Sequence, residues 1–338
     1  MKINHSLHLL SLFSGVGAFE RALENLSIPF TVSAFCEINQ YASKAYSILH
    51  QISESANLKD VTTADCSRFH DLIDLITYGF PCQDISIAGK KAGFFDGEGN
   101  ATRSGLFFDA VRIIQDVKPV IAIAENVKHL ASTKMEKEFS TVIRSLEDIG
   151  YNNYWRILNA KDYGLPQNRE RVFIVSIRKD ADNSFLFPEP EPLNLRMKDF
   201  LDSNVDESYF LSHEQCSRVV LLPPSSKGCH EEAKIIQAAD LSHYQNDQMN
   251  RVYSPDGLAP TLKSVSGGGR EIKVLDNHRI RKLTEREYFR LMGFTAEDAA
   301  LLKANGISKT QLYRMAGNSI AVPVLEKLFR ALGAYFSM

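Results

Sequence analysis

Strand-like and helix-like segments alternate along the first 180 residues, and this alternation constrains the fold more than any other feature. The strand-like segments are short apolar runs, whereas the helix-like segments repeat apolar residues every three or four positions. Such alternation predicts a doubly wound α/β sheet. The expected strands span residues 7–14, 31–37, 74–80, 120–126, 154–160 and 171–178, and the expected helices span 17–26, 39–50 (capped by Asn39), 105–117 and 135–150.

The alternation ends in the proline-rich stretch ADNSFLFPEPEPLNL, residues 181–195, which is typical of a linker. Residues 191 to about 280 lack the rhythm and include the glycine-rich run SVSGGGR. Helical patterns return at 283–294 and 322–336, and we expect the last helix to rejoin the first domain. The expected organisation is a first domain at 1–185 completed by 312–338, a second domain at 186–290, and a connection at 291–311.

Length and composition are those of an ordinary globular protein. The 338 residues suffice for one large and one smaller domain, and 44% are hydrophobic. No apolar run reaches the length of a membrane span, and the N-terminal segment runs into a glycine turn rather than a signal-peptide cleavage site. The odd number and wide spacing of the cysteines favour neither a zinc site nor a disulfide framework, which points to a reducing cytoplasm. The cysteines are Cys36, Cys66, Cys82, Cys216 and Cys229.

Charge is unevenly distributed, although the formal net charge is only -2. Acids outnumber bases between residues 196 and 250, whereas residues 251–290 hold nine bases against five acids. Such a cluster can face phosphate groups, with Arg251 and Arg270 as candidates. On charge alone, a solvated surface is the favoured interpretation.

Several candidate site residues follow strands of the expected sheet. Ligands of open α/β sheets bind beyond the carboxyl ends of the strands. Gly15 and Gly17 follow the first strand, and Glu37, which can accept both hydroxyls of a ribose, ends the second. Cys82 and Glu125 follow two further strands. Each has a plain alternative, namely a turn, a solvated acid or a packed thiol, but their convergence on one edge favours a site.

The glycine signal is not a full dinucleotide fingerprint. The run GVGAFE has Ala18 and lacks the third glycine at the expected place. A nicotinamide cofactor is therefore disfavoured.

Seven stretches occur in an order that is specific as a set, although PCQ or ENV would be weak singly. They are LFSGVGAFE, GFPCQDIS, RSGLFFD, ENV, QNRERVFIV, RKLTEREYFRLMGF and AGNSIAVPV. On these stretches the chain resembles the DNA (cytosine-5)-methyltransferase family, of the bacterial and phage type, over nearly its whole length. The resemblance implies a Rossmann-like S-adenosylmethionine-dependent methyltransferase domain with a smaller, irregular target-recognition domain, and the latter coincides with the loss of rhythm between RVFIVSIR and RKLTERE.

Methylation at C5 of cytosine requires help, because C5 is a poor nucleophile. A thiolate that adds to C6 makes C5 reactive towards a sulfonium-bound methyl group, and loss of the C5 proton then releases the thiolate. The resemblance assigns the thiolate to Cys82 and the turn that presents it to Pro81. It gives Glu125 a protonated contact with N3, a form that burial beside an apolar strand end favours. Arg171 would hold O2, and Arg169 would order the active-site loop or a phosphate.

The resemblance also implies S-adenosylmethionine as methyl donor, with S-adenosylhomocysteine as product and no metal. Glu37 would bind the ribose, Ile38 would pack on adenine, and Asp65 would bind the adenine amino group. Leu106 and Asn318 would complete the pocket. The other expected pocket residues follow the first strand and are Phe13, Ser14, Gly15, Val16 and Gly17.

Residues 83–104 resemble the family's active-site lid, which closes over DNA once the target base is flipped out. Thr261 would lie against the backbone of the flipped nucleotide. Gln248 would fill the space that the base leaves, because its amide can donate to and accept from the orphan guanine. A loop residue without contact is an equal alternative for Gln248, and Ser86 of the lid is then the next candidate.

Other functions stay open at this point. An RNA-methylating relative would carry a shorter recognition insert than residues 181–280, and a non-catalytic DNA-binding homologue would lose the Pro-Cys pair or ENV. Double-stranded DNA is the expected partner. We expect a monomer in the cytoplasm, associated with the nucleoid through DNA and with no membrane. A cognate restriction endonuclease acting separately is left open, and so is the recognition sequence.

Overall fold

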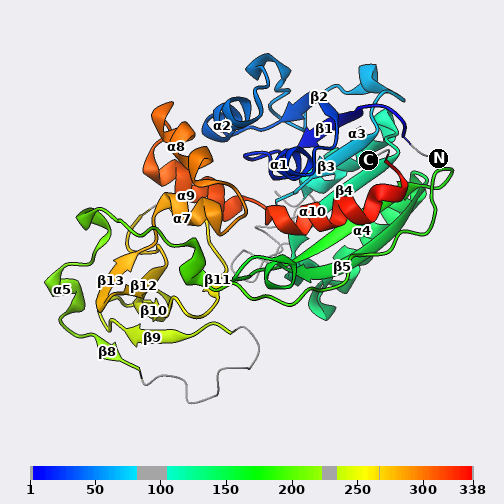
Figure 1. The fold of residues 1–338 in the computed structure, drawn as a ribbon. Helices are drawn as coiled ribbons and strands as arrows, with labels where there is room; N and C mark the ends of the chain where they lie inside the picture. Colours follow the sequence, from blue (N-terminus) through cyan, green and yellow to red (C-terminus); the bar gives the residue numbers. More distant parts are fainter. Residues whose placement is uncertain (1–2, 82–104, 223–233, 266, 337–338) are drawn as a thin grey trace, which may run out of the picture. The chain divides into compact units, whose positions relative to one another are not determined.

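The computed structural model describes residues 3–81, 105–222, 234–265 and 267–336 (Figure 1). Cys82 and Ser86 lie outside the described residues. The chain divides into two compact units. The first comprises Met1–Leu158, Glu170–Glu189 and Leu325–Met338, and the second comprises Asn159–Arg169 and Pro190–Val324.

A six-stranded sheet forms the centre of the first unit. Its strands are β1 (Leu7–Leu12), β2 (Phe30–Cys36), β3 (Leu75–Tyr78), β4 (Ile121–Val127), β5 (Tyr151–Asn159) and β7 (Glu170–Arg178). The strand order is β2-β1-β3-β4-β7-β5. β1 pairs in parallel with β2 and β3, β3 pairs in parallel with β4, and β7 is antiparallel to β4. The expected α/β fold is confirmed, with one antiparallel strand added beside the parallel set.

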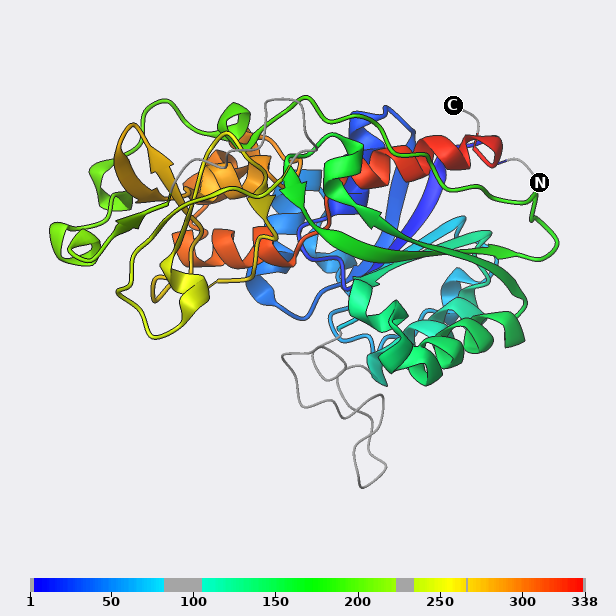
Figure 2. The same cartoon turned by 90° about the horizontal axis from the view of Figure 1, so that it is seen from below.

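Helices cover both faces of this sheet. They are α1 (Ala18–Asn25), α2 (Gln40–His50), α3 (Leu106–Val117), α4 (Glu136–Asp148) and α10 (Val322–Ala331). Figure 2 shows α3 and α4 on one side of the sheet and α1 and α10 on the other. Phe19 of α1 meets Phe329 of α10 with ring centroids 6.4 Å apart. The Asn39 side chain caps α2, as expected, by accepting from the N–H groups of Tyr41 and Ala42.

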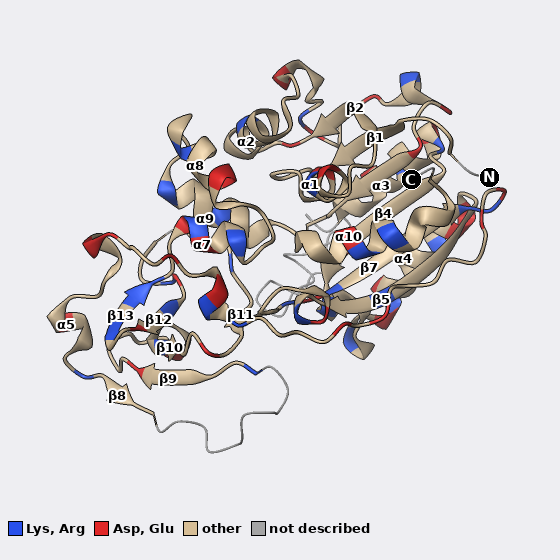
Figure 3. Ribbon diagram, viewed as in Figure 1, with Lys and Arg blue, Asp and Glu red and all other residues tan. Residues whose placement is uncertain are grey.

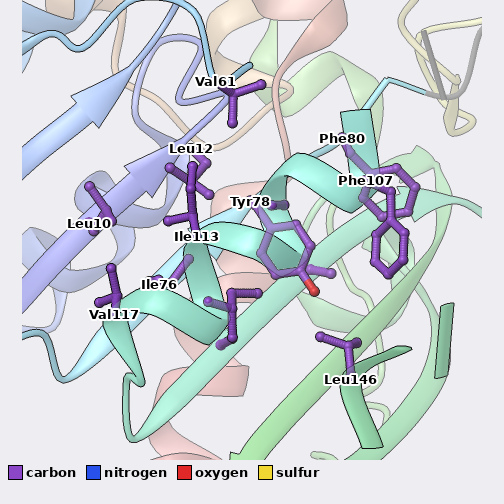
Figure 4. Packing of buried hydrophobic residues seen from close by; sticks show 14 of the residues in the cluster. Leu10, Leu12, Val61, Ile76, Tyr78, Phe80, Phe107, Ile113, Val117 and Leu146 are labelled. Carbon is purple, nitrogen blue, oxygen red and sulfur yellow. The ribbon is translucent and has the colours of Figure 1, made fainter. Parts of the chain in front are cut away.

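The main hydrophobic core lies between the sheet and helices α3 and α4 (Figure 4). Alternate residues of the strands face it, including Leu10 and Leu12 of β1 and Ile76 of β3, and Val117 and Leu146 come from the two helices. Each is at most 1% exposed, and full burial of such a side chain contributes about 1.5–3 kcal/mol. This core fixes the carboxyl ends of β1, β3 and β4 relative to one another, where candidate site residues follow.

The second unit contains a five-stranded sheet. Its strands, in sheet order, are β13 (Arg279–Lys282), β12 (Lys273–Asp276), β10 (Arg251–Tyr253), β9 (Gln237–Asp240) and β8 (Val220–Leu221). Only the β10–β12 pair is parallel. A small core of Ala239, Leu241, Val252 and Ile280 packs against this sheet. A separate parallel pair joins β6 (Gln167–Asn168) to β11 (Ala259–Pro260).

The helices of the second unit are short. They are α5 (His213–Cys216), α6 (Asp247–Asn250), α7 (Glu285–Arg290), α8 (Ala296–Ala304) and α9 (Lys309–Asn318). Capping boxes start three of them: Ser212 with Gln215 at α5, Thr284 with Glu287 at α7, and Thr295 with Asp298 at α8. No helix among the described residues is long and apolar enough to cross a membrane.

A buried ion cluster joins β13 to α7. The Arg281 side chain is fully buried, and its terminal nitrogens donate to both carboxylate oxygens of Glu287 at 2.9 Å. Its Nε donates to Asp276 at 2.6 Å. A bidentate pair with further hydrogen bonds is the arrangement that keeps buried charges tolerable, so Glu287 serves both as cap and as counter-ion.

Candidate active site

The turn after β3 is anchored from two sides. The buried Phe80 ring lies 5.1 Å from the Phe107 ring, as Figure 4 shows. The Asn126 side chain, which is 3% exposed, donates to the Phe80 carbonyl oxygen at 3.1 Å. Pro81 follows, half-buried, as the last described residue before Cys82. The backbone that leads to residue 82 is therefore fixed, and Asn126 is a contributor that sequence reasoning missed although it lies within ENV.

Glu125 and Arg171 form an ion pair beside this turn. Adjacent strands β4 and β7 carry them, and their Oε1 and Nε atoms lie 2.9 Å apart. Both side chains are largely buried, at 12% and 18% exposure. A Cβ at Gly79 would lie 3.8 Å from Glu125 Oε2, which places the carboxylate close to the end of β3. The guanidinium stabilises the charged carboxylate, a contribution that the sequence-based expectation of a protonated acid left out.

Arg169 occupies a different environment from Arg171. It is 3% exposed, and its terminal nitrogens donate to the carbonyl oxygens of Leu262, Gly317 and Ser319. These contacts lie within the second unit. They tie the segment after β11 to the end of α9, so we interpret Arg169 as a residue that positions backbone.

The loop between β1 and α1 contains three residues with left-handed backbone, namely Phe13, Gly15 and Gly17, with φ of 51°, 57° and 77°. A Cβ at Gly15 would meet nothing within 4 Å, whereas a Cβ at Gly17 would lie 2.1 Å from His50 Nε2. Gly15 therefore borders open space, and Gly17 is required for packing.

A buried polar cluster around His50 bonds the backbone of the same loop. His50 Nε2 lies 3.0 Å from the Val16 carbonyl oxygen, and its Nδ1 lies 2.7 Å from Glu24 Oε1. Both partners can only accept when Glu24 is ionised, so the pair satisfies an imidazolium. Burial alone would lower the pKa of His50, but the bond to Glu24 and the charge of Glu20 raise it above its ordinary value. Tyr46 donates to Glu20 at 2.9 Å and completes the group.

Glu37 follows β2 and points its carboxylate at the loop. Its two oxygens accept from the N–H groups of Gly15 at 2.9 Å and Asn39 at 2.7 Å. Burial raises the pKa of Glu37, and these two hydrogen bonds oppose the shift. The Asn57 side chain accepts from the N–H of Glu37 and donates to its carbonyl oxygen. Asn57 therefore fixes the backbone of Glu37, a role that its distance in sequence concealed.

Of the other expected pocket residues of the first unit, Ile38 and Leu106 are accessible, whereas Ser14 Oγ and the Val16 side chain are buried. Ile38 is 75% exposed next to Glu37, and Leu106 is half-buried at the first position of α3. Ser14 Oγ is buried without a hydrogen-bond partner in the described part of the chain. The Val16 side chain is only 2% exposed and faces the interior. An unpartnered hydroxyl, an exposed aliphatic side chain, a carboxylate and the open space at Gly15 fit an adenosyl ligand.

Asp65 forms local hydrogen bonds, and its expected contact with the adenine amino group stays a prediction. Its Oδ1 accepts from the N–H and hydroxyl of Ser67, contacts that lower the pKa of Asp65. Burial, Cys66 and the charge of Asp60 raise the pKa of Cys36, the last residue of β2, to about 12. Asp60, which accepts from the N–H and hydroxyl of Thr62 as Asp65 does from those of Ser67, is thus a second candidate carboxylate that sequence reasoning missed. No local pattern reveals it, because the neighbourhood depends on Leu58 N–H bonding Phe35.

Expected DNA-contacting residues lie in the second unit. Thr261 Oγ1 donates to the Asn168 carbonyl oxygen at 2.6 Å, and Gln248 Oε1 accepts from Lys263 Nζ at 2.5 Å. Arg251 and Arg270 are exposed. Asn318, the expected cofactor residue of this unit, is exposed at the end of α9.

Lys and Arg alternate with Asp and Glu in the second unit (Figure 3), and five of the nine bases at 251–290 form ion pairs. Arg279 forms a bidentate pair with Glu207, and Arg290 pairs with Asp202. Arg281 is buried in its ion cluster. Counting charges therefore overstates the free positive surface of this segment. The described residues contain no cluster suited to a metal ion.

Comparison with known proteins gives one family. The family described as C-5 cytosine-specific DNA methylase matches residues 7–334. A type II methyltransferase of Lactococcus lactis subsp. cremoris, M2.ScrFI, is 35% identical over 92% of this chain and 81% of its own length. The type II methyltransferase M.HhaI of Haemophilus parahaemolyticus is 32% identical over 97% and 94% of the two chains. The orphan methyltransferase M.SPBetaI of Bacillus phage SPbeta is 30% identical over 96% and 97%.

Solved structures agree at the level of the fold. The Entamoeba histolytica methyltransferase EhMeth superposes with a TM-score of 0.72 at 18% identity, covering 98% of both chains. The S. pombe Dnmt2 methyltransferase gives a TM-score of 0.69 at 20% identity, covering 98% of this chain and 99% of its own.

Proposed function

We propose, given that this chain belongs to the C-5 cytosine-specific DNA methylase family, that it methylates a flipped-out cytosine of double-stranded DNA through a covalent bond between Cys82 and C6. The observation that carries this proposal is the Glu125–Arg171 pair beside the anchored turn that ends at Pro81. It provides a carboxyl and a guanidinium, the two groups that a cytosine ring would need next to a thiolate.

The nucleophile is Cys82, at the end of the turn that Asn126 and Phe107 hold. Three other cysteines lie among the described residues, and burial raises the pKa of each thiol: to about 12 at Cys36, to about 11 at Cys66, and upwards at Cys216. A thiol with a raised pKa holds little thiolate at neutral pH. These three thiols are therefore poor candidates for the nucleophile, which supports the choice of Cys82.

Glu125 and Arg171 divide the contacts to the ring. Arg171 Nε is held by Glu125 and its Nη1 by the Glu170 carbonyl oxygen at 2.8 Å, so the guanidinium is oriented before a base arrives. It then holds O2, where negative charge develops as the thiolate adds. Glu125 binds N3 and transfers a proton to it, which requires the carboxyl to gain that proton when the base enters.

S-adenosylmethionine, when bound, supplies an electrophilic methyl group on a sulfonium. Glu37 would bind its ribose hydroxyls with the acceptor positions that Gly15 and Asn39 leave, and Ile38 would cover the adenine. Asp65 stays our candidate for the adenine amino group, and Asp60, whose charge acts on Cys36 at the end of β2, is a second candidate. Leu106 and Asn318 complete the proposed set.

Residues 186–290 are the proposed target-recognition domain, with Gln248, Arg251, Thr261 and Arg270 on the DNA side, and Ser86 in the lid. The C6 atom is inaccessible inside the base stack, so the target base has to be flipped. We propose that the protein works as a cytoplasmic monomer. Relatives bear both type II and orphan names, so a partner endonuclease is not a requirement of the proposal.

Transfer of a labelled methyl group from S-adenosylmethionine tests the function, with plasmid DNA and RNA as alternative substrates and bisulfite sequencing to locate the product. Glu125→Gln should lower the rate by about 10²–10⁴, the range for loss of a general acid. Glu170→Gln is the matched control, because this neighbouring carboxylate pairs with Lys128 at the surface. Incorporation of the label into RNA alone, or equal rates of methyl transfer for Glu125→Gln and Glu170→Gln, would refute the proposal.

A further inference from the structure

A buried lysine of the second unit bonds backbone rather than a carboxylate. Lys273 opens β12 and is 1% exposed. Its Nζ donates to the carbonyl oxygens of Met249 at 2.8 Å, Gly269 at 2.6 Å and Glu271 at 3.4 Å. The Tyr244 ring centroid lies 5.1 Å from the same atom. An ammonium has three hydrogens, so its donors match these three carbonyls, and within the described residues it forms no ion pair.

The two shortest bonds reach two different loops. We name residues 243–250 the α6 loop and residues 267–270 the glycine loop. The α6 loop carries Gln248 and leads into Arg251, and the glycine loop ends at Arg270. One amine therefore bonds the backbone of both loops that carry Gln248, Arg251 and Arg270, three of the residues proposed to face DNA.

Other side chains reach the α6 loop, namely Gln215 at the Tyr244 hydroxyl and Lys263 at Gln248, but among the described residues Lys273 alone is seen to bond the backbone of both loops. Asn250 closes the α6 loop on itself, since its Oδ1 accepts from the N–H groups of His243 and Tyr244 and its Nδ2 donates to the Tyr244 carbonyl oxygen. The glycine loop has left-handed backbone at three successive glycines, with φ of 93°, 72° and 78°. Such backbone is soft without an external contact. Lys273 supplies that contact.

We propose that Lys273 is a positioning residue for sequence recognition, which clamps the α6 loop to the glycine loop so that their side chains meet DNA in one arrangement. The inference rests on the proposed function of the second unit. Burial lowers the pKa of Lys273 to about 8, so the ammonium persists at neutral pH with all three hydrogens.

Two independent substitutions break the clamp. Lys273→Met keeps the length of the side chain and removes all its donors. Gly269→Ala leaves the lysine in place but puts a Cβ 2.8 Å from the Tyr244 ring. Gly268→Ala is its matched control, because φ is also positive there and nothing lies within 4 Å of the new Cβ. Lys198→Met controls for the lysine, since this exposed side chain bonds Asp256 and no other described residue.

The readout is the methylation rate at every cytosine of a plasmid, mapped by bisulfite sequencing, with the ratio of preferred to one-base-changed sites as the measure. A correctly placed base contact discriminates by about fivefold to a hundredfold. Lys273→Met and Gly269→Ala should lower the ratio by that factor, while the two controls keep it. An unchanged ratio in Lys273→Met overturns the proposal. If Lys273→Met does not fold, the Gly269 and Gly268 pair decides by the same criterion.

Hydrogen exchange separates this proposal from the proposed function. The amides of the α6 loop and the glycine loop should exchange faster in Lys273→Met than in Lys198→Met, whether or not DNA is methylated. If the wild-type protein methylates no DNA, the proposed function fails while faster exchange still supports the clamp. Unchanged exchange in both loops overturns the clamp itself.

Discussion

Gly17→Ala and Gly15→Ala form a matched pair that separates packing from ligand binding. Both glycines have left-handed backbone, at 77° and 57°, so each substitution costs about 1–2 kcal/mol of backbone strain. Only at Gly17 does the new Cβ collide, at 2.1 Å from His50 Nε2. The displaced ring would lose its bonds to Val16 and Glu24.

Those two bonds set the magnitude. Hydrogen bonds to charged groups contribute about 1.5–3 kcal/mol each. The sum for Gly17→Ala is then about 4–8 kcal/mol of unfolding free energy, against about 1–2 kcal/mol for Gly15→Ala. At Gly15 the methyl group would enter open space next to Glu37, where the cofactor is proposed to bind. Gly15→Ala should therefore weaken S-adenosylmethionine binding strongly at little cost in stability.

The assay uses the single tryptophan. Trp155 lies in β5 of the first unit and its ring is 4.8 Å from Phe139, so its fluorescence follows unfolding of that unit in urea. Calorimetry measures cofactor affinity for each folded variant. Equal losses of stability in the two variants would refute the packing role of His50. Undiminished affinity in Gly15→Ala would refute the proposed ligand position.

Three further predictions concern single contacts. Glu37→Ala should weaken S-adenosylmethionine binding by about 1.5–3 kcal/mol and leave DNA affinity unchanged, and equal cofactor affinity by calorimetry would reduce Glu37 to a solvated acid. Glu24 and Glu20 outweigh burial and raise the pKa of His50 in the folded protein, so its contribution to stability is complete below pH 6.5 and is lost as pH rises through the folded pKa. Urea unfolding should show this decline in the wild type but not in His50→Gln. Identical slopes of unfolding free energy against pH in the two proteins would contradict it. Glu287→Ala leaves the buried Arg281 with Asp276 as its remaining carboxylate, so thermal unfolding should show a loss of about 3–5 kcal/mol of unfolding free energy. A loss of less than about 1 kcal/mol would argue against a stabilising role of this ion cluster.

Periodicity predicted the first unit well because strands such as β1 and helices such as α3 express burial directly in their sequences. The second unit gave no such pattern. Its strands are two to four residues long, and its order depends on single buried groups such as Arg281 and Lys273. A charged residue in a sequence is ordinarily expected at the surface, so neither position could be recognised as buried without the fold.

The candidate site shows the same division. Gly15 and Glu37, which follow strands, and Glu125, near the end of β4, were predictable because the carboxyl ends of strands are places where ligands bind. The residues that orient them were not. Asn57 reaches Glu37 through a pairing that no short motif encodes, and the ion pair of Arg171 with Glu125 was not expected although both residues were. The roles of Arg169 and Asp65 were assigned by resemblance without knowledge of their hydrogen bonds.

Trapping on DNA that contains 5-fluorocytosine tests the central claim most directly, because fluorine at C5 blocks the elimination that releases the thiolate. The account predicts a covalent protein–DNA complex that survives denaturing electrophoresis, requires S-adenosylmethionine, and disappears in Cys82→Ser while that variant still binds the cofactor. A complex that persists in Cys82→Ser, or none with the wild-type protein on DNA that it methylates, would contradict the assignment of Cys82 as the nucleophile.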